Sequence, residues 1–101
     1  MSAVPNEPVF ERRRVGAVTV AMVSDGFLGI DPKLLPNSKP EEVTPLLEAA
    51  SLPQGPVRAS INTFVVDLPG MRVLIDAGLG PNLAETAGCL HENLSAAGVT
   101  P

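Results

Sequence analysis

The sequence has little aromatic or sulfur chemistry. Among its 101 residues there are no tryptophans, no tyrosines, three phenylalanines and a single cysteine, Cys89. A lone cysteine excludes an internal disulfide framework and fits a reducing compartment, so we expect a cytoplasmic protein. Because large aromatic side chains are scarce, the core must be built from aliphatic residues and methionine. These absences predict a modest core, as in a small subunit or in part of a larger domain.

Long apolar runs and positive charge are also scarce. No segment approaches the roughly 18 consecutive apolar residues that cross a bilayer, and residues 1–8 lack the order of a signal peptide. The net charge is −4, and only three of the seven basic residues are consecutive, in the run Arg12-Arg13-Arg14. We therefore expect neither a nucleic acid nor a membrane as a partner. The three arginines are interpreted as a solvated strand edge.

Residues that favour strands predict a first hairpin. The segment Arg14–Ser24 is rich in valine and threonine, which are common in strands. Asp25-Gly26 follows as a strong turn dipeptide, and the apolar segment Phe27–Ile30 suits a second strand folded back on the first. A catalytic role for Ser24-Asp25-Gly26 is the alternative, but an ordinary turn is the favoured interpretation.

Two apolar segments, Ala59–Leu68 and Met71–Asp76, predict a second hairpin around Pro69-Gly70. Proline followed by glycine is a common pair in tight turns. The uninterrupted run Val73-Leu74-Ile75 is typical of a strand that is covered on both faces. We therefore expect further layers on both sides of this hairpin.

Proline content indicates the domain organisation. We expect a loose leader over residues 1–14 and one domain over residues 15–101. Within that domain, residues 31–56 contain six prolines, which excludes a long strand and predicts an insertion with one short helix. Pro40-Glu41-Glu42 suits a first helical turn. At Pro45 the helix either kinks or restarts.

The final element is a predicted helix from Leu83 to Ala97, with apolar residues on one stripe and Gly98 as its stop. We expect it to pack over the second hairpin. The sequence thus predicts an α+β (α/β) fold in which antiparallel β-hairpins are covered by one or two helices.

Asp76 is the strongest candidate for a functional side chain. It ends an apolar strand and is followed by Gly78 and Gly80, so the strand delivers an acid to the rim of the sheet. The two glycines do not make a phosphate-binding loop, since the third glycine and the Lys-Ser/Thr pair of the sharper motifs are absent. From the residues alone, a cap of the following turn is the preferred interpretation of Asp76.

The residues for metal or nucleophilic catalysis are few. A catalytic zinc ion needs three protein ligands, whereas the sequence has one histidine, His91. Cys89 lies two positions away and points in another direction on the expected helix. The serines Ser24, Ser60 and Ser95 have no base other than His91. We expect His91 on a helix surface, Cys89 as a small apolar filler, and no zinc bound by this chain alone.

Four segments carry a family resemblance. They are Val-Ser-Asp-Gly-Phe at 23–27, Ser-Ile-Asn-Thr-Phe-Val-Val at 60–66, Val-Leu-Ile-Asp-Ala-Gly-Leu-Gly at 73–80, and the helix end at 94–99. In this order they resemble the N-terminal part of a metallo-β-lactamase-fold hydrolase, of the branch that contains methyl parathion hydrolase and related lactonases. The resemblance extends over nearly the whole chain beyond residue 14.

The resemblance implies a four-layer αβ/βα sandwich of which this chain is the N-terminal half. It also implies that Asp76 supports loops that bind the metal, and by position that Asn62 and the turn with Gly78 shape its surroundings. The zinc-binding motif of the family is a His-x-His-x-Asp-His run, which this sequence lacks. Zinc and a small-molecule substrate are therefore expected to bind through the missing C-terminal half.

Two functions are consistent with the sequence. In the first, the chain is a truncated N-terminal segment of a zinc-dependent hydrolase of esters, lactones or phosphotriesters, and is inactive alone. In the second, it is a small stand-alone α+β module for interaction or homo-oligomerisation, without catalysis. A third hypothesis, an enzyme that uses residues present here, would be excluded if joint replacement of His91 and Asp76 left a measured activity unchanged.

Overall fold

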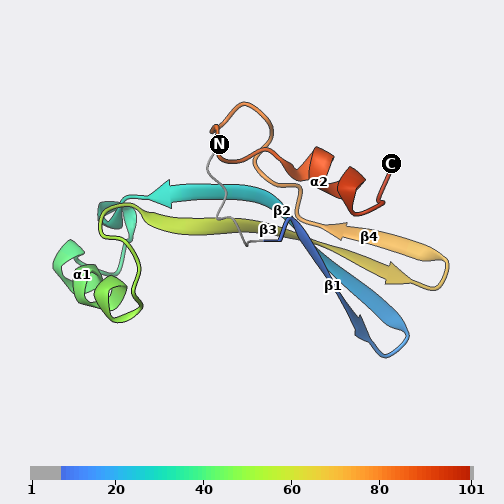
Figure 1. The fold of residues 1–101 in the computed structure, drawn as a ribbon, viewed down its shortest axis with the longest axis horizontal. Coiled ribbons are helices and arrows are strands. Elements are labelled where there is room, and N and C mark those ends of the chain that lie inside the picture. The colour runs from blue at the N-terminus through green and yellow to red at the C-terminus, as the bar shows by residue number, and fades with distance from the viewer. Residues whose placement is uncertain (1–7, 101) are drawn as a thin grey trace. The chain divides into compact units, whose positions relative to one another are not determined.

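The structure is a computed structural model that describes residues 8–100. Its elements are β1 (Phe10–Val15), β2 (Val18–Ile30), the 3-10 helix η1 (Pro32–Leu34), α1 (Pro40–Ala49), β3 (Val57–Leu68), β4 (Met71–Ile75) and α2 (Leu90–Ala96) (Figure 1). The chain divides into two compact units, one of residues 28–59 and one of the segments before and after it. None of the helices within residues 8–100 is long and apolar enough to cross a membrane.

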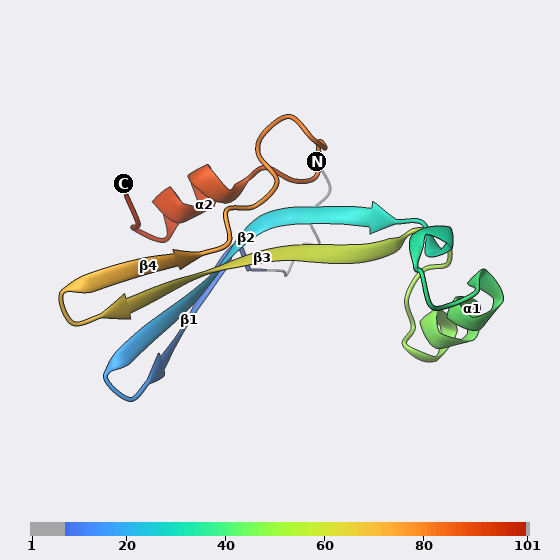
Figure 2. The ribbon, with the colours of Figure 1, turned by 180° about the vertical axis from the view of Figure 1, so that it is seen from behind.

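The strands form one sheet in the order β1-β2-β3-β4 (Figures 1 and 2). In the first, antiparallel hairpin, Val15 pairs with Val18, so the chain reverses at Gly16-Ala17. The turn predicted at Asp25-Gly26 is wrong, because β2 continues through this dipeptide to Ile30. β1 also begins within the expected leader, whose residues 10–14 are strand, while residues 1–7 lie outside the described residues.

The second hairpin was predicted correctly. β3 and β4 are antiparallel, with Leu68 paired to Met71 and Phe64 paired to Ile75. The connection is therefore the two residues Pro69-Gly70, as expected from their turn chemistry. This hairpin places the end of β4, and Asp76 directly after it, beside the middle of β3, which extends from Val57 to Leu68.

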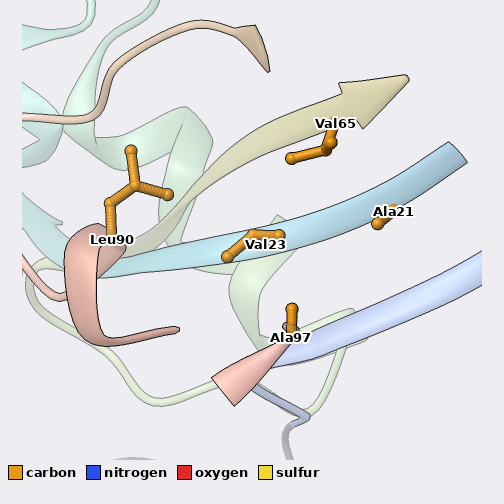
Figure 3. Close-up of a cluster of buried hydrophobic side chains, with 5 residues drawn as sticks. All are labelled: Ala21, Val23, Val65, Leu90 and Ala97. Carbon is orange, nitrogen blue, oxygen red and sulfur yellow. The ribbon is translucent and has the colours of Figure 1, made fainter. Parts of the chain in front are cut away.

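One face of the sheet carries the core of the larger unit. Alternate residues of β2, together with Val65 of β3, point toward α2 because side chains alternate along a strand. They form a cluster of buried residues with the beginning and the end of the helix (Figure 3): Ala21, Val23, Val65, Leu90 and Ala97. The side-chain amide of Asn93 also donates to the carbonyl oxygen of Ser24, at 2.9 Å. Apolar contact and a hydrogen bond thus hold α2 on β2.

The opposite face of the β3–β4 hairpin is largely uncovered. Residues paired across an antiparallel ladder share a face, and the register joins three apolar pairs here. We call these six residues the open face: Phe64, Val66, Leu68, Met71, Val73 and Ile75. Met71 is 61% exposed and Ile75 is 51% exposed. The expectation that β4 is covered on both faces is therefore wrong for the part of the chain that the structure describes.

The last helix is shorter than predicted. α2 begins at Leu90 rather than at Leu83, because residues before it bond to β2 where a helix would bond to its own preceding turn. Phe27 donates its N–H to the carbonyl oxygen of Thr86 at 2.8 Å, and Cys89 donates to that of Asp25 at 3.0 Å. These tertiary bonds replace the first two turns of the predicted helix.

The end of α2 agrees with the sequence. Gly98 follows the helix with a φ of 78° and donates to the carbonyl oxygen of Ser95 at 3.0 Å, while Val99 donates to that of Leu94 at 2.8 Å. This pair of bonds is the Schellman arrangement, which satisfies the free carbonyl groups at a helix end. Gly98 is confirmed as the stop.

The smaller unit contains η1 and α1. α1 runs without a break from Pro40 to Ala49 with Pro45 inside it, so the alternative of a restart at Pro45 is wrong. Its beginning is fixed by the Glu42 carboxylate, which accepts a hydrogen bond from the N–H of Lys39 at 3.1 Å. Val43 and Leu47 are buried on one side of the helix, and this burial offsets the helical bond that proline cannot donate.

Candidate functional site

Asp76 lies in the turn that follows β4. Its Oδ1 accepts hydrogen bonds from the N–H groups of Ala77 at 2.6 Å and of Gly78 at 3.1 Å. This is the capping arrangement that the residues alone favoured. A carboxylate can accept several more donors, and the Asp76 side chain is exposed. The turn therefore presents an acid with spare acceptor capacity at the end of β4.

A second carboxylate, that of Asp25, holds the same turn from the inside. Asp25 is 1% exposed. Its Oδ2 accepts from the N–H of Leu79 at 2.8 Å and from that of Gly88 at 3.3 Å. Its Oδ1 accepts from the N–H of Leu90 at 2.9 Å. Hydrogen bonds to a charged group are about twice as strong as neutral ones, so this buried acid is well satisfied by backbone donors.

Sequence reasoning treated Asp25 as a turn residue and missed this role. The signal that was available is alternation, since Ala21, Val23 and Asp25 occupy every second position of one strand. An acid at the end of such a series lies on the core face, where a polar group must find partners. The sequence does not reveal those partners, because they lie 54 to 65 residues further along the chain.

The close approach of another backbone segment explains why a glycine, Gly26, follows this acid. A Cβ atom at this position would lie 2.0 Å from the carbonyl oxygen of Thr86, so a side chain would collide with the loop that crosses β2. The hydroxyl group of Thr86 donates to the carbonyl oxygen of Phe27 at 2.6 Å and holds the loop there. Gly26 thus permits a close approach of two backbones rather than a reversal of the chain.

The other predicted site residues, Asn62 and Gly78, lie near the end of β4. Asn62 is an exposed residue of β3, two positions before Phe64, which pairs with the last residue of β4. Gly78 lies against Asp25, whose Cγ would be 2.5 Å from a Cβ at that position. The functional roles of Asp76, Gly78 and Asn62 stay predictions.

His91 and Cys89 make no hydrogen bond with Asp76 among the described residues. His91 is exposed on α2 and, with Arg72, Leu74 and Leu94, lines a hollow of about 380 Å³. Cys89 is half-buried. Burial raises the pKa of its thiol above the ordinary value, and the negative charges of Glu92 and Asp25 raise it further. Its thiol is therefore a poor nucleophile at neutral pH.

In the part of the chain that the structure describes, the side chains that could bind zinc do not cluster. Within residues 8–100, no three histidine, cysteine, aspartate or glutamate side chains come together in a group that could hold a metal ion. A structural or catalytic zinc ion requires at least three such ligands. The residues of the described chain therefore do not fit a complete zinc site.

Comparison with known proteins gives matches to solved structures. No family model matches the sequence, and no curated protein matches it. AidC, a dizinc quorum-quenching lactonase, is 22% identical with a TM-score of 0.83, over 90% of this chain and 32% of AidC. AbOPH, a hydrolase in the beta lactamase superfamily, is 26% identical with a TM-score of 0.84, over 95% of this chain and 33% of AbOPH. The chain thus spans about a third of the length of each hydrolase.

These matches establish the fold. The chain has the α+β arrangement of antiparallel hairpins and a covering helix that both hydrolases contain over the matched third. The metallo-β-lactamase fold that the sequence resemblance implied is confirmed at this coarse level.

Proposed function

We propose that the chain is the N-terminal part of a metal-dependent hydrolase of the metallo-β-lactamase fold, acting on an ester, a lactone or a phosphotriester. The observation that carries this proposal is the fold match, which covers at least 90% of this chain but about a third of each hydrolase. The two zinc ions named for AidC support zinc as the metal. The ligands would come from residues outside the described chain.

In this proposal Asp76 supports the loop that carries the metal ligands. The exposed position of its carboxylate at the end of β4 allows it to accept hydrogen bonds from a neighbouring loop. The two bonds from its own turn fix the direction of the side chain. Asn62 and Gly78 border this position and would shape the surroundings of the metal site.

The test begins with the sequence that follows the Pro101 codon in the source transcript, read in all three frames. We expect a strand and then a His-x-His-x-Asp-His run. The longer protein should contain zinc after purification and hydrolyse at least one member of a panel of lactones, aryl esters and phosphotriesters. Downstream sequence without such a run, or a longer protein without zinc and without hydrolysis, would contradict the proposal.

Within the longer protein, Asp76→Asn tests the role of the acid. Asparagine keeps the oxygen that caps the turn but removes the charge, so we expect kcat to fall by at least about tenfold with the fold intact. Asp31→Asn is the control, because Asp31 is exposed and bonds only locally, to the N–H of Lys33. An equal activity of both variants would exclude Asp76 from the site.

The open face favours a second candidate function, that of an interaction module. Contiguous apolar surface on a sheet marks a place where protein packs against protein. A stand-alone module would form a discrete oligomer through this face, whereas a severed part of a larger domain would aggregate. Sedimentation velocity over a hundredfold range of concentration separates these outcomes, because a discrete dimer gives one reversible boundary.

A further inference from the structure

The carboxylate of Asp25 joins two segments that are separate in the sequence. One oxygen binds the turn through Leu79, and both oxygens bind the residues that open α2, through Gly88 and Leu90. A shift of either segment takes an N–H away from its acceptor, and these groups are partly buried at Leu79 and Gly88 and buried at Leu90. An N–H that is left unsatisfied away from water carries a desolvation penalty. The turn and the start of α2 therefore share one anchor.

We propose that Asp25 is the positioning residue of the turn 76–80: it fixes the place of Asp76 and couples it to α2. The functional role of Asp76 rests on the proposed function, and this inference adds the residue that holds Asp76 in place. The coupling itself is a property of this chain and does not depend on metal or substrate.

The backbone of Asp76 supports the proposal. Its φ is 73°, in the left-handed region that aspartate enters more readily than most residues with a Cβ atom. The conformation still costs free energy, so contacts that hold the turn help to maintain it. The bond from Leu79 to Asp25, three residues further on, is such a constraint. It holds the far end of the turn while the Asp76 side chain holds the near end.

Two glycines of the turn provide a matched test. Gly78 and Gly80 both have positive φ values, 72° and 82°, so alanine is strained to a similar degree at either position. A Cβ at Gly78 would lie within 2.7 Å of three carboxylate atoms of Asp25, whereas a Cβ at Gly80 meets nothing within 4 Å. The difference between the two alanine variants therefore isolates contact with Asp25.

The first experiment measures amide hydrogen exchange by NMR in the full chain, for Gly78→Ala and for Gly80→Ala. We expect Gly78→Ala to speed exchange at Gly88 and Leu90, in the distant segment, by at least about tenfold, and Gly80→Ala to change it by less than about twofold. If the Gly78→Ala chain does not fold while the Gly80→Ala chain does, this outcome also supports the coupling. Equal effects of the two variants would overturn the coupling.

The second experiment separates positioning from general stability. Asp25→Asn keeps the shape of the side chain but turns one acceptor into a donor that faces backbone N–H groups. The readout is the amide chemical shift of Ala77 and Gly78, which bond to Asp76 and not to Asp25. Their shifts should move while those of Gly16 and Ala17, in the turn at the far end of the β1–β2 hairpin, stay. Unchanged shifts at both amides would leave Asp25 a merely structural role.

If Asp25→Asn does not fold, the glycine pair decides the question. Both experiments are done without zinc and without substrate. A longer protein that lacks hydrolase activity would therefore contradict the proposed function and leave this coupling intact, whereas equal glycine effects would remove the coupling and leave the proposed function standing.

Discussion

The face of the sheet that α2 covers and the open face are built from similar aliphatic residues but differ greatly in burial. Val23 and Val65 on the covered face are 0% and 1% exposed, whereas Met71 on the open face is 61% exposed. Hydrophobic stabilisation is roughly proportional to the apolar area removed from water. Most of the stability of the larger unit therefore comes from one face, and the other face has the composition of a core without its burial.

The largest expected effect comes from the covered face, at Asp25. Asp25→Ala leaves three backbone N–H groups without their acceptor, one of them buried and two partly buried. A buried unsatisfied group costs about 1–3 kcal/mol, and partly buried groups cost less. We expect a loss of at least about 3 kcal/mol in the free energy of unfolding, measured by urea denaturation. Asp31→Ala, at an exposed acid, is the control. A loss below about 1 kcal/mol would contradict the role given to Asp25.

A pair of valines compares the faces directly. Val65→Ala should lower the free energy of unfolding by about 2 kcal/mol, because two methylene-sized groups leave a packed site. Val73→Ala on the open face, where Val73 is 36% exposed, should lower it by about 0.5 kcal/mol or less. Urea denaturation of both variants provides the measurement. Similar losses would mean that the open face is covered in solution.

A charge on the open face should change association more than stability. Met71→Lys places an ammonium group at the most exposed residue of this face, where solvation costs little. We expect weaker binding of a hydrophobic dye and a smaller sedimentation coefficient at high concentration, with the urea midpoint nearly unchanged. An unaltered sedimentation profile would show that this face does not drive association.

The smallest expected effect is at the exposed ion pair of Asp67 and Arg72. A hydrogen bond from Arg72, assisted by its charge, lowers the pKa of the Asp67 carboxyl below its ordinary value. The pair therefore contributes above the ordinary pKa of an aspartate, and its contribution is lost as the pH falls through the lowered value. Arg72→Ala should raise the pKa of Asp67 toward the ordinary value in an NMR titration. The urea midpoint at pH 7 should stay unchanged, because exposed pairs contribute little.

Local chemistry was sufficient for some elements and insufficient for others. The β3–β4 hairpin and the stop at Gly98 were predicted because their determinants are neighbours in the sequence. The first hairpin was misplaced, since Asp25-Gly26 has the composition of a turn but serves a loop that crosses the strand. The predicted helix lost its first half because hydrogen bonds to β2 replaced helical ones, which is a tertiary override of local propensity.

The turn after β4 was predicted in part. Asp76 was singled out because it ends an apolar strand before two glycines, a pattern that is visible within ten residues, and the structure shows it capping that turn. Its functional role stays a prediction. Asp25 was not identified, since an acid that binds backbone N–H groups leaves no side-chain motif to detect. Burial of β4 on both faces was inferred from its apolar composition alone. Composition cannot distinguish an apolar face that is covered from one that is exposed in this chain.

The crossing at Gly26 has a consequence for how sequences of this kind evolve. Asp25 supplies an acceptor for backbone N–H groups far along the chain, and Gly26 leaves room for the backbone of Thr86. These two different requirements fall on adjacent residues. A substitution at either position disturbs the same loop, which contains Thr86 and Gly88. In relatives with this fold we expect the dipeptide to persist as a unit while the strand around it varies, and its persistence would mark the crossing point of the loop.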